Sequence, residues 1–243
     1  MKNDGIFILT FLLTFGMGSC GSGKSESEID IRDCEQIRVK MADQGRSISV
    51  SVSAAPGARK NIWTDLDGNG KRDKGGKEDV KEFDKYVEYF PVEGLKYLGF
   101  CGEITKLECS DNNFVEIFVV NNQSIEYLDC SRNEVRNMDI KAAVKLDTLL
   151  CSRNKLKAVD FSRNARLSYI ECYLNTISGK DMRDLIESLP DRRGEKSGII
   201  VAIDFGNKSE YNVVRKSDVL QADARNWKIY ALGDSKPFEG VDD

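Results

Sequence analysis

Oxygen-bearing side chains gather in one short stretch of the N-terminal half, which reads DLDGNGKRD from Asp65 to Asp73. The first, third, fifth and ninth positions offer side-chain oxygens, the sixth is a glycine suited to a sharp turn, and the seventh offers its backbone carbonyl. Ca²⁺ takes six to eight oxygen ligands, and calcium-binding loops present them at this spacing. The sequence therefore predicts a calcium site and calcium as the candidate cofactor. The predicted metal ligands are Asp65, Asp67, Asn69, Lys71 and Asp73.

The stretch departs from the calcium pattern at its end. The twelfth position, where a bidentate glutamate closes such loops, is Gly76, and the nearest carboxylates are those of Glu78 and Asp79. The preceding residues Asn61–Thr64 have the composition of a strand, whereas a helix precedes the loop in an EF-hand. Two interpretations stay open. One is a weak site with a dissociation constant of about 10⁻⁴ to 10⁻³ M, and the other is a solvated, glycine-rich hairpin turn without an ion.

The chain of 243 residues contains no histidine. The commonest general base and the usual partner of a nucleophilic serine or cysteine are therefore absent, so we expect no enzyme. Asp129 and Glu171, two repeats apart, would lie about 9 to 10 Å from each other at the usual spacing of strands. That distance permits the geometry of an inverting hydrolase, but exposed carboxylates without a cleft are rarely catalytic. Lys and Arg total 36 against 40 Asp and Glu, and the net charge of −4 argues against a nucleic-acid partner.

Four of the seven cysteines recur at a spacing of 21 residues. Each lies in a segment of the form L-x-x-L-x-C-x-x-N-x-L, with Ile, Val or Phe at some of the Leu positions. A fixed period predicts stacked units, so we expect each segment to form a short strand that pairs in parallel with the next. The expected buried columns are Leu107, Leu128, Leu149 and Ile170, and Cys109, Cys130, Cys151 and Cys172.

The polar and sulfur-containing residues of these segments have structural interpretations. An asparagine follows each cysteine by three residues and is expected to bond to backbone groups where the chain leaves the strand. Metal-binding cysteines come in closely spaced pairs, whereas here each segment has one, so buried thiols are predicted rather than a metal or redox site. Cys34 and Cys101 lie outside the segments, and a disulfide between them in an oxidising compartment stays open.

The repeated segments resemble leucine-rich repeats, in the cysteine-containing 21-residue form of internalin-J-like bacterial surface lipoproteins. The resemblance implies an α/β solenoid, with a short leucine-rich-repeat ladder between an N-terminal β cap and a C-terminal α/β cap. The corresponding boundaries are 30–103 for the N-terminal cap, 104–178 for the repeats and 179–243 for the C-terminal cap. It also implies adhesion to host or neighbouring cells. Fold alone does not specify function, so this implication rests on the resemblance.

Alternation and helical periodicity predict the elements that flank the repeats. Strands are expected over Ile37–Met41, Ile48–Ala54, Asn61–Thr64, Tyr86–Phe90, Leu95–Phe100, Gly198–Phe205 and Trp227–Leu232. Helices are expected over Met182–Leu189 and Ser217–Asn226, the second with Ser217 as its N-terminal cap.

The N-terminus has the features of a bacterial lipoprotein signal. Residues 6–15 form an uncharged apolar run, too short to span a membrane, and small residues precede Cys20. We therefore predict a signal peptide over 1–19, lipid modification of Cys20 and a flexible tether over 20–29. The expected location is the outer membrane of a Gram-negative cell, held by the lipid and exposed at the surface. A plain secreted protein is the alternative.

Exposed positions on the predicted strands offer a binding surface. Tyrosines beside carboxylates suit recognition of a protein or a glycan, because a tyrosine combines a large apolar face with a hydroxyl. The predicted ligand-binding residues are Lys106, Glu108, Tyr127, Asp129, Tyr169, Glu171 and Tyr173. The favoured function is adhesion or recognition without catalysis, and the alternative is a structural or assembly subunit that faces the periplasm.

Overall fold

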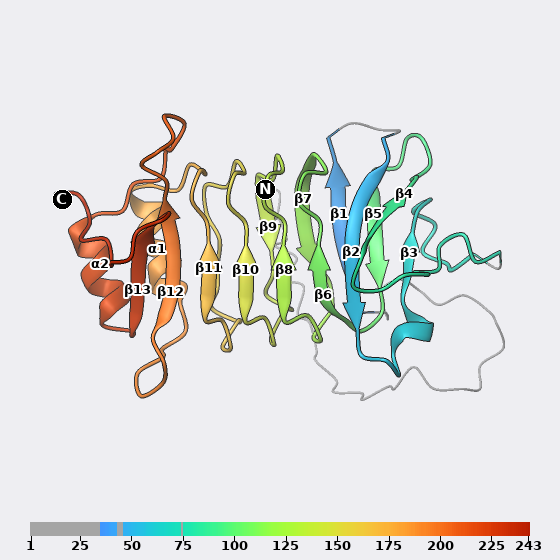
Figure 1. Ribbon diagram of the computed structural model, residues 1–243, viewed down its shortest axis with the longest axis horizontal. Coiled ribbons are helices and arrows are strands. Elements are labelled where there is room, and N and C mark those ends of the chain that lie inside the picture. The colour runs from blue at the N-terminus through green and yellow to red at the C-terminus, as the bar shows by residue number, and fades with distance from the viewer. Residues whose placement is uncertain (1–34, 43–45, 74) are drawn as a thin grey trace, which may run out of the picture.

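The computed structural model of the chain describes residues 35–42, 46–73 and 75–243. The predicted signal peptide, the predicted lipidation site Cys20, the predicted tether and Cys34 all lie outside these residues. The described part is elongated, and its strands lie side by side along the long axis (Figure 1). Within these ranges no helix combines the length and apolar character that a membrane crossing requires.

Two mixed β-sheets enclose the core. The smaller sheet contains, in spatial order, β3 (Trp63–Asp65), β5 (Tyr97–Cys101), β1 (Gln36–Met41), β7 (Phe114–Val119) and β9 (Asn137–Asp139). β1 is antiparallel to both of its neighbours, β5 and β7, while β7 and β9 are parallel. An N-terminal strand therefore completes a sheet with strands from two distant parts of the sequence.

The larger sheet extends along the whole described molecule. Its strands are, in spatial order, β13 (Trp227–Ala231), β12 (Gly198–Ile203), β11 (Tyr169–Glu171), β10 (Thr148–Leu150), β8 (Tyr127–Asp129), β6 (Ile104–Glu108), β2 (Ile48–Ala54) and β4 (Tyr86–Tyr89). The strands from β6 to β13 run parallel, whereas β2 is antiparallel to both β6 and β4. The predicted register is present, because Leu107, Leu128, Leu149 and Ile170 pair in sequence.

The space between the sheets is filled by apolar side chains. The four cysteines of the 21-residue segments belong to the same apolar core, with at most 1% of their surface exposed. Burial raises the pKa of each thiol, for Cys172 to about 12, because the interior does not solvate a thiolate. The expectation of buried, neutral thiols is confirmed for Cys109, Cys130, Cys151 and Cys172. Cys101 is also buried, on β5.

Buried asparagines connect successive segments. The side-chain amide of Asn133 donates to the carbonyl oxygens of Cys109 and Cys130, at 2.9 and 3.0 Å. Asn154 and Asn175 repeat this arrangement one and two segments later. The predicted backbone bonding of these asparagines is confirmed. Asn212, outside the repeated pattern, continues the series by donating to Cys172 and Ala202.

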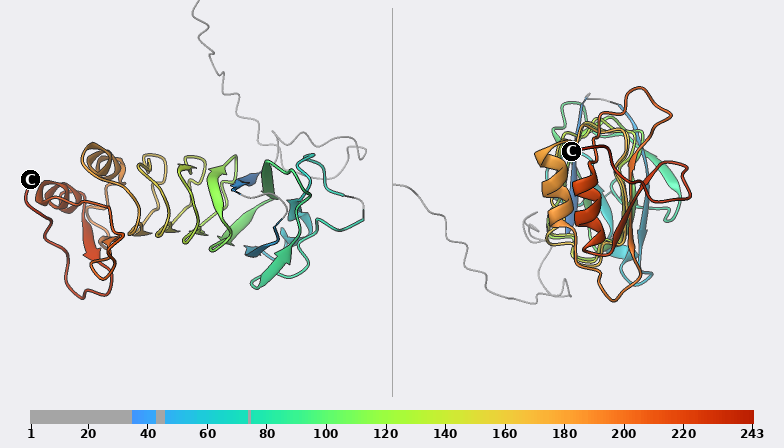
Figure 2. Two further views of the ribbon diagram at one scale, coloured as in Figure 1. Left: turned by 90° about the horizontal axis from the view of Figure 1, so that it is seen from above. Right: turned by 90° about the vertical axis from the view of Figure 1, so that its left-hand side faces the viewer.

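Two helices cover the C-terminal strands. α1 (Lys180–Ser188) buries Met182, Leu185 and Ile186, and α2 (Lys216–Asp223) packs beside it on the side opposite the exposed face of β12 and β13 (Figure 2). The prediction that Ser217 caps α2 is wrong. Arg215 is the N-cap residue of α2. Its backbone N–H donates to the carboxylate of Asp218, in the first turn of the helix, at 2.8 Å, and this hydrogen bond caps the N-terminus of α2.

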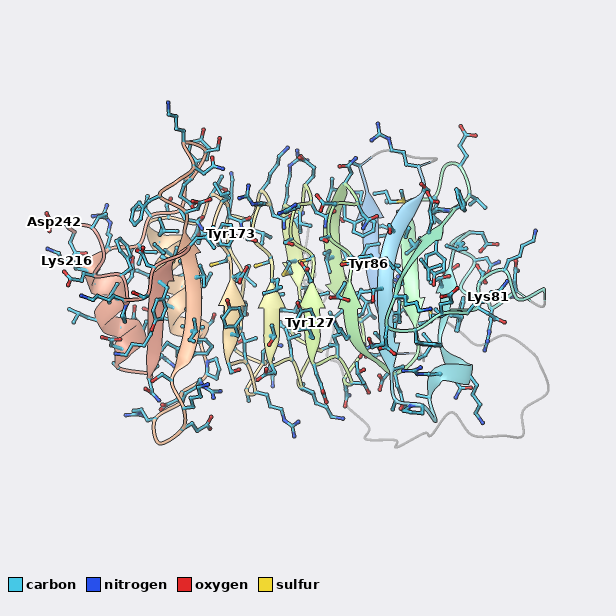
Figure 3. All side chains as sticks on the ribbon, viewed as in Figure 1. Lys81, Tyr86, Tyr127, Tyr173, Lys216 and Asp242 are labelled. Carbon is cyan, nitrogen blue, oxygen red and sulfur yellow. The ribbon has the colours of Figure 1, made fainter. Side chains whose placement is uncertain are left out.

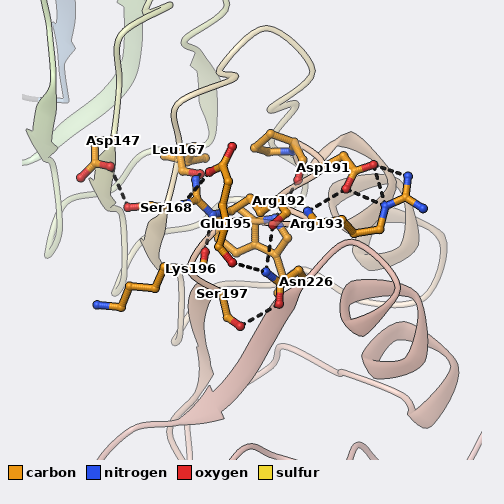
Figure 4. Close-up of polar contacts among 12 residues, drawn as sticks. Asp147, Leu167, Ser168, Asp191, Arg192, Arg193, Glu195, Lys196, Ser197 and Asn226 are labelled. Atoms are coloured by element: carbon orange, nitrogen blue, oxygen red, sulfur yellow. Dashed lines mark hydrogen bonds and ion pairs between the residues drawn. The ribbon is translucent and has the colours of Figure 1, made fainter.

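A polar network fixes the turn between α1 and β12 (Figure 4). The Asn226 side chain donates to the carbonyl oxygens of Arg192 and Glu195, both at 2.9 Å, and accepts a hydrogen bond from the Ser197 hydroxyl. The Arg192 guanidinium donates to the Leu167 carbonyl oxygen at 3.1 Å. The C-terminal elements are therefore tied to the last of the 21-residue segments.

The predicted fold class, an α/β solenoid of leucine-rich repeats, is wrong. The described residues are mainly β-sheet, with 30% in strands and 10% in helices, and both sheets are mixed. Residues 151–168 connect β10 to β11 through turns and irregular segments, without a helix. β1 and β2, from the residues expected to form an N-terminal cap, pair with β7 and β6.

Candidate functional site

The calcium-like stretch forms a tight loop that leaves the end of β3. Gly68 and Gly70 adopt φ values of +72° and +73°, which few other residues tolerate, and they turn the chain back on itself. The Gly70 N–H donates to Oδ2 of Asp65 at 3.1 Å. We call the segment from Asp65 to Glu78 the acidic loop, with its description excluding residue 74.

The carboxylates of Asp65, Asp67 and Glu78 converge in this loop. One oxygen from each can be chosen so that all lie within 4.8 Å of one another. Glu78 is only 2% exposed, and its two oxygens accept the N–H groups of Leu66 and Asp73, at 2.8 and 2.9 Å. Its backbone carbonyl accepts the Thr64 N–H at 2.7 Å, so the strand β3 holds the glutamate in place.

The electrostatics of this cluster are unfavourable for three adjacent anions. Burial raises the pKa of Asp65, and the negative charge of Asp67 adds to that rise. Burial also raises the pKa of Glu78, with Asp65 and Asp67 as its charged neighbours. Oδ1 of Asp65 is buried and has no hydrogen-bond partner within the described residues. A buried acceptor without a partner is costly, so the cluster has unused capacity for a donor or a cation.

The structure brings two of the five predicted metal ligands into the cluster, Asp65 and Asp67. Asn69 lies beside them, donating from its side chain to Oδ2 of Asp67 at 2.6 Å, and its Oδ1 accepts the Lys71 N–H. Asp73 contributes its backbone N–H to Glu78. Glu78 was not among the predicted ligands, although its carboxylate is two positions beyond the expected glutamate position.

A hollow of about 480 Å³ lies against part of the acidic cluster. It is lined by Asp65, Asp67 and Gly68, by residues 92–99 and by Arg38. The Arg38 guanidinium donates to the Gln36 side chain at 2.8 Å. The hollow therefore reaches two of the three carboxylates of the cluster.

A second candidate site occupies the outward side of the larger sheet. Strand register aligns Lys106, Tyr127, Thr148 and Tyr169 in one row, and Glu108, Asp129, Leu150 and Glu171 in the next. Neighbouring strands lie about 4.8 Å apart, so Tyr127 and Tyr169 are separated by about 9.6 Å along their row. We define the tyrosine face by the following side chains: Tyr86, Lys106, Glu108, Tyr127, Asp129, Tyr169, Glu171 and Tyr173.

Contacts within the tyrosine face hold its side chains in place. The Lys106 ammonium lies 3.0 Å from Glu108 Oε1 and 4.8 Å from the centre of the Tyr127 ring. The Tyr169 hydroxyl donates to Oε1 of Glu171 at 2.7 Å. Asp129 accepts from the Ser131 hydroxyl, also at 2.7 Å. The strand register thus aligns six of the predicted residues on one side of the sheet, and their role in ligand binding stays a prediction.

Tyr86 belongs to this surface but was not predicted. It lies on β4, next to Ser51 of β2, which in turn pairs with Glu108 of β6, and 55% of its surface is exposed (Figure 3). Partial burial and the nearby carboxylates of Glu108 and Asp129 raise its pKa. Burial and the same carboxylates raise the pKa of Tyr127 to about 12. Each ring is therefore a neutral phenol at physiological pH.

Tyr173 lies beyond the end of β11, at the margin of this surface (Figure 3). The Arg153 guanidinium is 5.8 Å from the centre of its ring and 3.7 Å from the Asp204 carboxylate. Tyr173 and Tyr127 therefore each have a cation near the ring, Arg153 and Lys106 respectively, whereas the Tyr169 hydroxyl bonds to Glu171.

Comparison with known proteins gives no family for the chain. No family model matches it, and neither the curated proteins nor the solved structures contain a match.

Proposed function

We propose that the chain is a non-catalytic binding protein of the bacterial cell envelope, anchored by a lipid on Cys20, whose tyrosine face recognises a protein or a glycan. The observation that carries the proposal is the alignment of tyrosines and carboxylates in adjacent rows of one sheet. No other described element of the chain lies over these strands in the face-on view of Figure 1.

The chemistry of the tyrosine face supports contact with a hydroxyl-rich or basic ligand. Tyrosine rings offer apolar surface with little conformational entropy to lose, and carboxylates accept hydrogen bonds from hydroxyl or ammonium groups. One lysine stands against three carboxylates in the face. This charge balance disfavours the phosphates of a nucleic acid.

The tyrosine face can be tested with single substitutions and two defined probes, a neutral oligosaccharide array and a panel of lysine- and arginine-rich peptides. Tyr127→Ala and Tyr169→Ala should each weaken binding about tenfold or more, as for central residues of an interface. Tyr211→Ala is the matched control, because Tyr211 is 64% exposed and lies outside the tyrosine face. Equal binding by both variants and the parent chain would contradict the proposed face.

The Asp129→Asn variant separates the two ligand classes. The amide oxygen still accepts a hydrogen bond from a sugar hydroxyl, but the charge that attracts a basic peptide is gone. Glycan binding that is retained in the variant would support a glycan ligand. A protein ligand would be supported if the variant lost only peptide binding and if peptide binding by the parent chain weakened at high salt. A folded chain that binds neither probe class would favour the alternative of a structural subunit.

The location can be tested independently of the ligand. Protease treatment of intact cells should release the folded body by cleavage within residues 21–28, and Cys20→Ser should abolish labelling by a fatty-acid analogue. Protection from protease until the outer membrane is opened would place the body in the periplasm. In that case the search should turn to envelope assembly partners.

A further inference from the structure

We propose that the acidic loop binds one Ca²⁺ ion through the carboxylates of Asp65, Asp67 and Glu78, with Glu78 in the role of the glutamate that the loop pattern lacks. The inference concerns the smaller sheet and does not depend on the function proposed for the tyrosine face.

The first argument is the state of Asp65. This residue is 5% exposed, its Oδ2 accepts the Gly70 N–H, and its Oδ1 is buried without a partner in the described part of the chain. A carboxylate oxygen is an acceptor only, so an adjacent carboxylate cannot satisfy it. A bound cation supplies the missing interaction and neutralises part of the charge that Asp67 and Glu78 bring to the same place.

The second argument is the position of Glu78. Gly76, at the twelfth position, has a φ of +65° and provides no side chain, and the chain then brings Glu78 back against the start of the loop. Each of its oxygens accepts one backbone N–H, which leaves acceptor capacity on both. The two hydrogen bonds therefore orient the carboxylate without exhausting it.

The third argument concerns the identity of the ion. Ca²⁺–O distances are about 2.3–2.6 Å, so two oxygens on one ion can be up to about 5 Å apart, and the three carboxylates meet this limit with oxygens within 4.8 Å of one another. Ca²⁺ accepts irregular sets of carboxylate, carbonyl and water oxygens, whereas Mg²⁺ demands near-ideal octahedra at shorter distances. The hollow beside Asp65 and Asp67 admits both the ion and the waters that complete its shell.

Calcium titration of the full-length chain by calorimetry tests the inference. We expect a single site with a dissociation constant of about 10⁻⁴ to 10⁻³ M, as in extracellular modules. Ten millimolar Ca²⁺ should then raise the melting temperature by about 3–10 °C, and Mg²⁺ at the same concentration should raise it less. Tb³⁺ luminescence excited through Trp63, two residues before Asp65, provides a second readout.

Charge-removing variants identify the ligands. Asp67→Asn and Glu78→Gln should each weaken Ca²⁺ binding at least tenfold, and Asp67 is exposed, so its variant should keep the fold. Asp79→Asn is the matched control, because this neighbouring carboxylate bonds to the Arg72 guanidinium at 2.7 Å and lies outside the cluster. The unfolding transition of each variant without calcium shows whether it is folded.

Three results would overturn the inference. The first is the absence of calorimetric heat, of a shift in melting temperature and of Tb³⁺ luminescence with the folded parent chain. The second is equal affinity in the parent chain and in folded Asp67→Asn, which would place the ion elsewhere. A loss of affinity in Asp79→Asn as large as in Asp67→Asn would likewise show that general acidity, and not this cluster, attracts the ion.

Discussion

The Asn154 side-chain amide donates to the carbonyl oxygen of Cys130, which lies one segment earlier, at 3.0 Å. The same amide donates to the Cys151 carbonyl oxygen at 3.1 Å, and its oxygen accepts the Val135 N–H at 2.9 Å. One side chain, 8% exposed, thus satisfies backbone groups from two consecutive segments. Without it the buried Val135 N–H would lose its partner, and the carbonyl oxygens of Cys130 and Cys151 would each keep only one side-chain donor, from Asn133 and Asn175.

Replacing Asn154 by Ala should destabilise the chain by about 2–4 kcal/mol, because the buried Val135 N–H loses its partner and two buried carbonyl oxygens each lose one of their two side-chain hydrogen bonds. Asn112→Ala should cost less. Asn112 has the same position in the first segment but is only half-buried, and one of its side-chain donors bonds to the carbonyl oxygen of Ser49. Urea unfolding of both variants measures the difference. Equal losses in the free energy of unfolding would show that the burial of the asparagine amide does not determine its contribution to stability.

The packing of Gly198 against Trp227 gives a second prediction. A Cβ atom on Gly198 would lie 2.5 Å from Cδ2 and 2.7 Å from Cε2 of the fully buried indole. Gly198→Ala should therefore lower stability by about 1–3 kcal/mol through overpacking. Gly57→Ala is the control, since nothing lies within 4 Å of its added Cβ. Thermal unfolding measures the difference, and equal melting temperatures for both variants and the parent chain would contradict the close packing of Gly198 against Trp227.

The column of cysteines predicts a pattern of chemical reactivity. In the folded chain, Cys109, Cys130, Cys151 and Cys172 should resist iodoacetamide, because the thiols are buried and protonated. All four should react in urea, as mapped by mass spectrometry. A cysteine placed at the exposed Ser209 should react readily in the folded chain and thereby show that the reagent is active. Rapid native labelling of the column would contradict the observed core.

The same thiols predict alkaline instability. Their pKa values are raised in the folded state, so the unfolded chain loses protons first and stability falls as the pH rises above the unfolded thiol pKa of about 8.5. Each thiol contributes a slope of about 1.4 kcal/mol per pH unit. Cys151→Ala should therefore reduce the loss of stability between pH 9 and 10 by about that amount. Denaturant unfolding at each pH provides the measurement, and identical slopes in the two chains would refute the assignment.

Local patterns in the sequence predicted the local structure well. The 21-residue spacing predicted the register of β6, β8, β10 and β11, because each strand pairs with the equivalent residues of the next segment. The insertion of β1 between β5 and β7 has no such signal, because antiparallel pairing between unrelated segments depends on the whole fold. The predicted α/β class is wrong for a related reason, because no local pattern specifies the connections between the strands. The prediction took these connections from the resemblance, whereas in the structure they are turns held by buried asparagines.

The candidate sites show the same division. Spacing alone identified Asp65 and Asp67, which are close in sequence and share a loop. Glu78 reaches them only because the Thr64 N–H fixes its backbone against β3, a contact that the loop pattern does not encode. Alternation identified the rows of the tyrosine face on the parallel strands. Tyr86 escaped notice because the antiparallel strands β2 and β4 place it beside Glu108.

The central position of β1 has a mechanical consequence. If Cys20 holds the protein at a membrane, as proposed, a force that pulls the folded part away from the membrane acts on the described residues at their N-terminal end, near Gln36, where β1 begins. This strand is hydrogen-bonded along both edges, to β5 and to β7. Force along it loads both ladders at once instead of opening one bond after another. The first described strand is thus one whose extraction requires shearing two interfaces together.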